Sequence, residues 1–233
     1  MKSHPSGNFQ QFYVDTIEGH LTGEGGTHST LGPHPIWEAR GQGVLQELIE
    51  QGLKPTDIVV DFGCGTLREG LNFIRYLEPG HYIGLDIDER VLQAGRRLVG
   101  PELLALKRPF LAIVSEEVID QVAALKPAWV TSSYVLSQMP PREVDEYVDN
   151  LAKLMEGGGR AILQVRLRWR TKQYSKTGWY HCSRQMTRRL AKRGLVVLQM
   201  RTHDLTSKPH KVRGVDARLL VGKLGSDLAV RSL

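Results

Sequence analysis

The chain has 233 residues, 41% of them hydrophobic, which suits one soluble domain with a sizeable core. No apolar run approaches the ~20 residues that span a bilayer, and the first residues lack the apolar core of a signal peptide. Two cysteines, Cys64 and Cys182, are too few for a disulfide framework or a four-cysteine metal site. We therefore expect a cytoplasmic protein without a metal centre.

Charge is distributed unevenly along the chain, whose net charge is +6. Residues 1–150 hold 12 Lys and Arg against 21 Asp and Glu, whereas residues 151–233 hold 19 against 4. One interpretation is that the C-terminal third faces an anionic partner. The other is that its arginines pair with the acidic first part of the same molecule.

The elements expected before residue 167 alternate between strands and helices. Residues 1–35 are rich in Gly, His, Thr and Pro and are predicted to form a flexible segment or lid. A helix follows from about residue 36 to 50, where apolar residues recur at helical spacing. Strands are then expected at 57–61, 82–86, 110–114, 128–133 and 161–165, with helices at 66–77, 88–98, 116–125 and from Pro140 to before Gly157. This alternation predicts a doubly wound, mostly parallel sheet.

The tail of the chain has a different pattern. Residues 167–182 form a basic, aromatic insertion, and Ser183 can cap a helix that ends near Gly194. Strands at 195–200 and 217–223 follow with no helix between them, so they are expected to be antiparallel. The main domain is predicted to span residues 36–233.

The most informative motif is the run from Ile58 to Gly70, in which a buried strand ends at Asp61 and Gly63 and Gly65 open a tight turn. Glycine has no Cβ, so a nucleoside cofactor can approach such a turn closely. Asp86 closes the next strand, 21 residues after Gly65, where a carboxylate would meet a ribose diol. A nicotinamide site would have a third glycine where Arg68 stands.

The run resembles motif I of the class I S-adenosylmethionine-dependent methyltransferases, and the resemblance extends over about residues 40–225. Residues 132–140 look like the family's fourth-strand segment, although Gln138 stands where a histidine is common. The resemblance implies a Rossmann-like, seven-stranded sheet with an antiparallel final strand, and S-adenosylmethionine as cofactor. It implies that the cofactor-binding residues are Asp61, Gly63, Cys64, Gly65, Thr66, Asp86, Ile87, Glu116 and Ser133.

Methyl transfer to a hydroxyl requires orientation of the acceptor and removal of its proton. Tyr134, at the tip of the fourth strand, lies where the transferred methyl group is found in the family. His181, which precedes the helix at 183, and His210 are the other candidate catalytic residues. His181 ranks first because the insertion before it can cover the site.

Three functions remain open for the acceptor side. The chain also resembles a bacterial subgroup linked to polysaccharide or secondary-metabolite biosynthesis, which implies O-methylation of an anionic sugar, glycan or other small molecule. RNA methylation is the second, because aromatic and basic residues interleave in the insertion. Against it, residues 131–134 lack the Pro-Pro-aromatic motif of base amino-group methyltransferases, and no cysteine lies nearby for C5 chemistry. The third is a catalytically silent, cofactor-binding subunit.

The protein is expected to be a monomer or a homodimer.

Overall fold

The computed structural model describes residues 34–175, 177–204 and 214–224 and divides the chain into two compact units, Met1–Val118 and Ile119–Leu233. The predicted N-terminal lid lies outside the described residues, and the predicted single domain of residues 36–233 stays a prediction. No helix among the described residues is long and apolar enough to cross a membrane.

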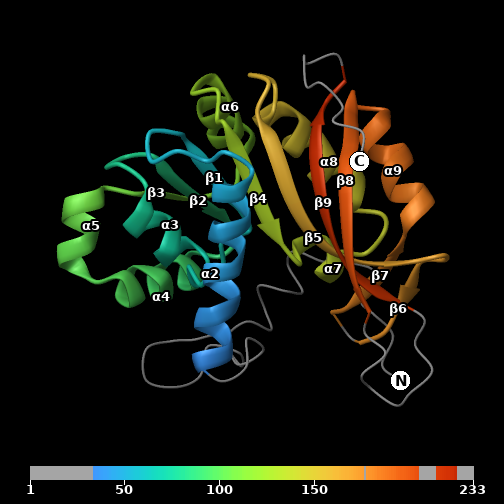
Figure 1. The fold of residues 1–233 in the computed structure, drawn as a ribbon, viewed down its shortest axis with the longest axis horizontal. Coiled ribbons are helices and arrows are strands. Elements are labelled where there is room, and N and C mark those ends of the chain that lie inside the picture. Colours follow the sequence, from blue (N-terminus) through green and yellow to red (C-terminus); the bar gives the residue numbers. More distant parts are fainter. Residues whose placement is uncertain (1–33, 176, 205–213, 225–233) are drawn as a thin grey trace. The chain divides into compact units, whose positions relative to one another are not determined.

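The first unit is built on three parallel strands in the order β3-β2-β1 (Figure 1). Strands β1 (Val59–Phe62) and β2 (Tyr82–Asp86) are buried along their whole length, whereas β3 (Phe110–Ile113) is partly exposed. Asp61 lies opposite Gly84, and Leu85 lies opposite both Phe62 and Ala112. The carboxyl ends of β1 and β2, and with them the glycine turn and Asp86, are therefore held side by side.

The described helices beside these strands are α2 (His34–Glu50), α3 (Gly70–Tyr76), α4 (Glu89–Val99) and α5 (Pro101–Lys107). Helix α6 (Glu116–Ala124) begins at the end of the unit. Helices α3 and α4 both pack on β2. Asp88 caps α4 by accepting a hydrogen bond from Arg90 N at 2.8 Å. Helix α5 was not predicted, because it buries no residue and so leaves no apolar periodicity in the sequence.

The helix expected at 66–77 begins four residues late, at Gly70. Leu67 has a left-handed φ of 61°, which a right-handed helix cannot include. Its side chain is fully buried, and a Cβ on Gly95 of α4 would meet Leu67 Cγ at 2.7 Å. Burial of this leucine against α4 outweighs its helix propensity, so residues 65–69 form a series of turns.

Two glycines of α2 give a matched test of this packing. A Cβ on Gly41 would lie 2.6 Å from Arg68 O, whereas a Cβ on Gly43 would meet nothing within 4 Å. We expect Gly43→Ala to stabilise the protein by about 0.5–1 kcal/mol through helix propensity. Gly41→Ala should instead destabilise it by about 1–3 kcal/mol, because backbone must move. Urea unfolding of both variants measures the difference, and a gain in stability for Gly41→Ala would contradict the predicted contact of α2 with the turn.

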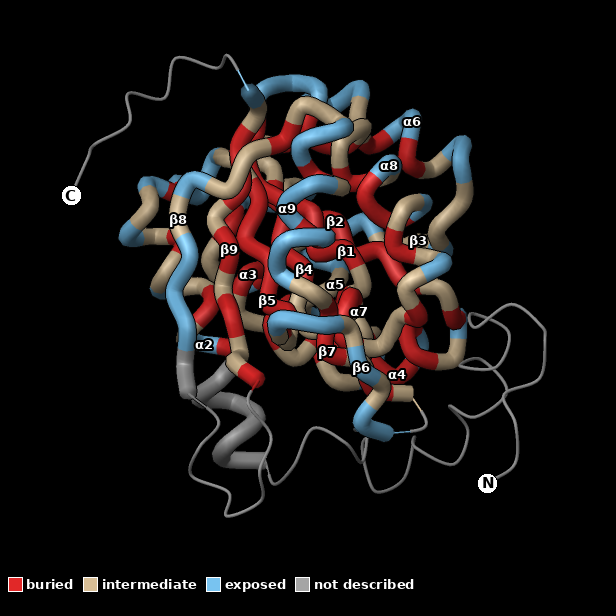
Figure 2. The backbone as a smooth tube through the Cα atoms, turned by 90° about the vertical axis from the view of Figure 1, so that its right-hand side faces the viewer, coloured by how far each residue is buried: buried red, intermediate tan, exposed pale blue. Residues whose placement is uncertain are grey.

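The second unit contains the antiparallel strands expected in the tail. Strand β5 (Arg160–Arg168) pairs in parallel with β4 (Trp129–Ser133) and antiparallel with β9 (Val215–Lys223), and β9 pairs antiparallel with β8 (Leu195–Asp204). The predicted antiparallel end of the sheet is confirmed. Figure 2 shows β5 largely buried and β8 exposed along much of its length.

The basic insertion forms a hairpin of two short strands, β6 (Lys172–Gln173) and β7 (Trp179–Cys182). Leu167 pairs with His181 of β7 while also pairing with Val215 of β9, so β7 lies on the edge of β5 opposite to β9. That edge is the one that β4 occupies up to Gln164. The hairpin therefore continues the ladder beyond the tip of β4, next to Tyr134.

Helices α7 (Val135–Gln138), α8 (Val144–Leu154) and α9 (Ser183–Ala191) complete the second unit. The predicted apolar face of α8 is confirmed, since Val144, Tyr147, Val148, Leu151 and Leu154 are buried. Arg189 of α9 and Arg193, which follows α9, form ion pairs with Asp145 and Asp149 of α8. Part of the basic tail is thus neutralised within its own unit.

Candidate functional site

The turn after β1 is tied to the end of β2 by backbone hydrogen bonds. Gly63 N and Cys64 N both donate to Leu85 O, at 2.7 and 3.0 Å. Gly63 and Gly65 have φ values of 85° and 56°, in the region that favours glycine. A Cβ on Gly65 would meet nothing within 4 Å, so the backbone is open to close approach at this residue.

Asp86 joins this turn to the end of β2. Its Oδ2 accepts a hydrogen bond from Gly65 N and its Oδ1 accepts one from Ile87 N, both at 2.8 Å. Burial raises the pKa of Asp86, and these backbone hydrogen bonds oppose the rise by stabilising the carboxylate. With a third hydrogen bond from the backbone of Asp88, three of the roughly four lone-pair sites of the carboxylate are used, so one remains to accept from a ribose hydroxyl while Asp86 orders the turn.

Asp61 is the most deeply buried acid of the first unit, with 2% of its surface exposed. Tyr82, whose hydroxyl donates to Asp61 Oδ2 at 2.9 Å, is its partner. Burial raises the pKa of Asp61 well above its ordinary value, and the charges of Glu69 and Asp86 raise it further. A cationic group bound beside Asp61 would relieve this cost.

The remaining cofactor candidates of the first unit differ in their surroundings. Thr66 is buried, and its hydroxyl has no hydrogen-bond partner among the described residues. Burial raises the pKa of the Cys64 thiol, which keeps it protonated and unsuited to act as a nucleophile. Glu116 is exposed in the first turn of α6. The structure thus brings Asp61, Gly63, Cys64, Gly65, Thr66, Asp86 and Ile87 together around one turn.

These residues fit the nucleoside and amino-acid ends of S-adenosylmethionine. The glycine turn admits close approach of a ligand, Asp86 offers carboxylate oxygens to a ribose, and Thr66 holds a hydroxyl that lacks a partner. Asp61 offers a buried carboxylate to an ammonium group. No cluster of three or more His, Cys, Asp or Glu side chains that could hold a metal ion occurs in the described part of the chain.

In the second unit, Tyr134 has a strained backbone at the tip of β4. Its φ of 62° and ψ of 5° are left-handed, a conformation that costs a non-glycine residue about 1–3 kcal/mol and often occurs at functional sites. Tyr134 N donates to Gln164 O at 2.9 Å, which fixes the residue against β5. The Gln164 amide, oriented to satisfy its neighbours, donates to Ser133 Oγ at 3.2 Å and accepts from Arg218 Nε at 2.7 Å.

Arg166 of β5 lies beside Tyr134 and was not among the predicted site residues. Its guanidinium is 5.5 Å from the Tyr134 ring and 5.0 Å from the Tyr174 ring. It donates to Asp216 at 3.3 Å and to the Tyr174 hydroxyl, and its backbone N donates to Ser137 Oγ. Arg166 is therefore held in place by groups on either side.

His181 is buried, with 1% of its surface exposed. Its Nε2 lies 2.6 Å from Leu136 O, and because a carbonyl only accepts, Nε2 must carry the proton. Nδ1 is then an acceptor without a partner among the described residues. Burial lowers the pKa of His181, so the ring is neutral near pH 7. Its catalytic role stays a prediction; in this conformation it joins β7 to α7. His210 lies outside the described residues.

The fold agrees with that of known methyltransferases. Magnesium protoporphyrin IX methyltransferase from Synechocystis PCC 6803, with bound S-adenosylmethionine, has a TM-score of 0.64 at 16% identity, covering 95% of this chain and 100% of that chain. A Burkholderia thailandensis 1,6-didemethyltoxoflavin N1-methyltransferase, with bound substrate and S-adenosylhomocysteine, has a TM-score of 0.62 at 12% identity, covering 96% and 93%. No protein-family model and no curated protein matches the sequence.

The chain therefore has the Rossmann-like fold of class I S-adenosylmethionine-dependent methyltransferases, as the sequence predicted. The same fold is also found in the [4+2]-cyclase SpnF, with a TM-score of 0.66 at 12% identity, covering 96% of this chain and 99% of that chain. At sequence identities this low, the structural likeness establishes the fold alone. The chemistry has to be argued from the residues of the site.

Proposed function

We propose that this protein is an S-adenosylmethionine-dependent methyltransferase that methylates a hydroxyl group of a small anionic acceptor, such as a sugar. The observation that carries the cofactor is Asp86, whose two oxygens accept from Gly65 N and Ile87 N and so join a ribose-binding acid to an open glycine turn. When bound, S-adenosylmethionine supplies an electrophilic methyl group.

The residues have separate parts in this proposal. Asp61 holds the ammonium group of the cofactor, and Asp86 holds its ribose. Tyr134 contacts the acceptor, and its ring offers a flat surface on which a sugar can stack. When the methyl group is transferred, the acceptor hydroxyl would give its proton to the Tyr134 hydroxyl oxygen, and Tyr134 would pass its own proton to water.

The test of the activity is a screen with cofactor labelled in its methyl group against sugar phosphates, sugar acids, glycans and tRNA. Transfer to a small hydroxylated acceptor is the expected result. Label on tRNA alone would support the RNA alternative, and S-adenosylhomocysteine binding without transfer to any acceptor would favour the silent subunit.

Tyr134→Phe tests contact with the acceptor. Removing the hydroxyl should lower kcat by about 10²-fold, because a positioned proton-transfer group contributes 10²–10⁴-fold. Binding of S-adenosylhomocysteine should not change. Tyr76→Phe is the matched control, since it also removes one hydroxyl, the one that donates to Leu53 O. An unchanged kcat in Tyr134→Phe would remove Tyr134 from the acceptor site.

A further inference from the structure

The side chains of β5 alternate between an apolar and a polar face. Leu163, Val165 and Leu167 are buried, whereas Gln164, Arg166 and Arg168 share the opposite face because strand residues alternate. Arg166 and Arg168 are thus successive residues on one face, about 7 Å apart along the strand. The polar face leads from the tip of β4 toward the β6–β7 hairpin.

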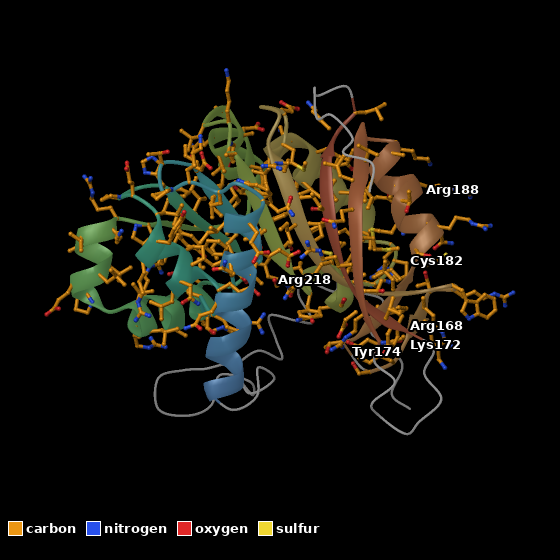
Figure 3. The ribbon with its side chains drawn as sticks, viewed as in Figure 1. Arg168, Lys172, Tyr174, Cys182, Arg188 and Arg218 are labelled. Carbon is orange, nitrogen blue, oxygen red and sulfur yellow. The ribbon has the colours of Figure 1, made fainter. Side chains whose placement is uncertain are left out.

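The hairpin adds a third cation to this face. Arg168 lies opposite Cys182 of β7, and Lys172 of β6 lies opposite Tyr180 of β7. Residues 180 and 182 of one strand point to the same side, so Lys172 and Arg168 flank the same stretch of β7. Figure 3 shows Arg168, Lys172 and Tyr174 at this end of the second unit. We call Arg166, Arg168 and Lys172 the hairpin cation cluster.

Tyr180 of β7 is connected to the cluster through Tyr174, whose ring Arg166 covers. Its ring is buried against Gly214, where an added Cβ would lie 2.4 Å from Tyr180 Cε1, and it packs on Tyr174 at 4.8 Å. Burial raises the pKa of Tyr180, and the charges of both Arg166 and Arg168 oppose that rise. The electrostatic field of both arginines therefore reaches Tyr180.

The charge of the cluster is only partly balanced. Asp216 pairs with Arg166. Arg168 and Lys172 form no ion pair with any described carboxylate, and the buried Nε of Arg168 has no hydrogen-bond partner there. Three cations and one carboxylate leave a net charge of +2 within the cluster. A carboxylate ligand would balance half of it, whereas a phosphate monoester carries about −1.5 to −2.

We propose that the hairpin cation cluster binds a phosphate group of the acceptor, so that the substrate is a phosphorylated hydroxyl compound such as a sugar phosphate. The proposal rests on the proposed function and names its substrate class. Arginine presents a planar fork of donors that matches phosphate oxygens, and Arg166 is already oriented by Asp216 and Tyr174. The phosphate would lie beside Tyr134, with the methylated hydroxyl toward the tip of β4.

The experiment is a titration of the full chain with inorganic phosphate in the presence of S-adenosylhomocysteine. Arg168→Gln should weaken phosphate binding about tenfold, because hydrogen bonds between charged groups are stronger than those between neutral groups. Lys172→Gln, at an exposed position, should weaken it by a smaller factor without risk to folding. Arg170→Gln is the matched control, because it removes the same charge from a side chain that lies over exposed Trp169 instead.

Equal losses of phosphate affinity in Arg168→Gln and Arg170→Gln would overturn the proposal, because they would indicate a general effect of charge. Absence of phosphate binding to the unchanged protein would overturn it too. Methyl transfer by the unchanged protein to a hydroxylated acceptor, measured alongside S-adenosylhomocysteine affinity, separates this outcome from failure of the proposed function, in which no transfer occurs. Tight binding of an RNA oligonucleotide with a steep salt dependence would replace the small phosphorylated acceptor with a nucleic acid.

Discussion

Replacing Asp86 by alanine is expected to weaken binding of S-adenosylhomocysteine by about 10- to 100-fold. The carboxylate has two roles, accepting from the ribose hydroxyls and ordering the turn through Gly65 N and Ile87 N. Each hydrogen bond to a charged group is worth about 1.5–3 kcal/mol, and 1.4 kcal/mol is tenfold in affinity. Calorimetric titration measures the loss directly. Asp86→Asn keeps one acceptor oxygen, so its affinity for S-adenosylhomocysteine should lie between those of Asp86→Ala and the unchanged protein.

Asp88→Ala is the control for this prediction. Asp88 lies two residues away, caps α4 and pairs with Arg90 at 2.6 Å. Its replacement should lower the free energy of unfolding by about 0.5–2 kcal/mol and leave cofactor affinity unchanged. If Asp86→Ala is folded and binds as tightly as the unchanged protein, the cofactor site proposed here is wrong.

Much of the fold could be predicted because burial leaves a periodic pattern. The stripe of α8 and the mostly apolar strands β1 and β2 are examples, and all three are buried as expected. Helix α3 was placed too early, because the left-handed backbone of Leu67 depends on a tertiary contact with Gly95. Helix α5 has no buried residue, so its sequence carries no pattern to detect.

The candidate site was predicted in part. The turn residues and Asp86 follow from local sequence, because glycine and a strand-end acid are needed there whatever else surrounds them. Tyr82 is set by the fold, since its hydrogen bond to Asp61 joins residues far apart in the sequence. The alternation of Gln164, Arg166 and Arg168 with apolar residues was visible in the sequence, and it would have extended the predicted strand 161–165 to its true end.

The two interpretations of the basic tail each describe different arginines. Arg189 and Arg193 are bound to Asp145 and Asp149, so their charge serves the contact between α8 and α9. Arg168 and Lys172 have no such partner in the described residues. A count of charges could not separate these groups, because the sheet register decides which side chains meet. Of these two groups, the second is the one that the proposed phosphorylated acceptor would meet.

Asp61 is expected to make cofactor binding depend on pH. Burial raises its pKa, so the folded protein without ligand holds a proton there above the ordinary aspartate range of about 4. The proton must leave before the carboxylate can pair with an ammonium group. Affinity for S-adenosylhomocysteine should therefore rise with pH up to the raised pKa of Asp61 and level off above it, with a proton released on binding.

The sign of the stability effect is opposite. An acid with a raised pKa in the folded state adds no cost below its unfolded pKa, and the cost of burying its charge grows as pH rises through the folded pKa. The ligand-free protein should thus lose stability over the same range in which ligand affinity increases. Asp61→Asn is nearly isosteric and carries no charge, so it should abolish both dependences and weaken binding by about tenfold at the upper end. Thermal melting with and without ligand across this range measures both effects, and an unchanged pH dependence in Asp61→Asn would assign the titration to another group.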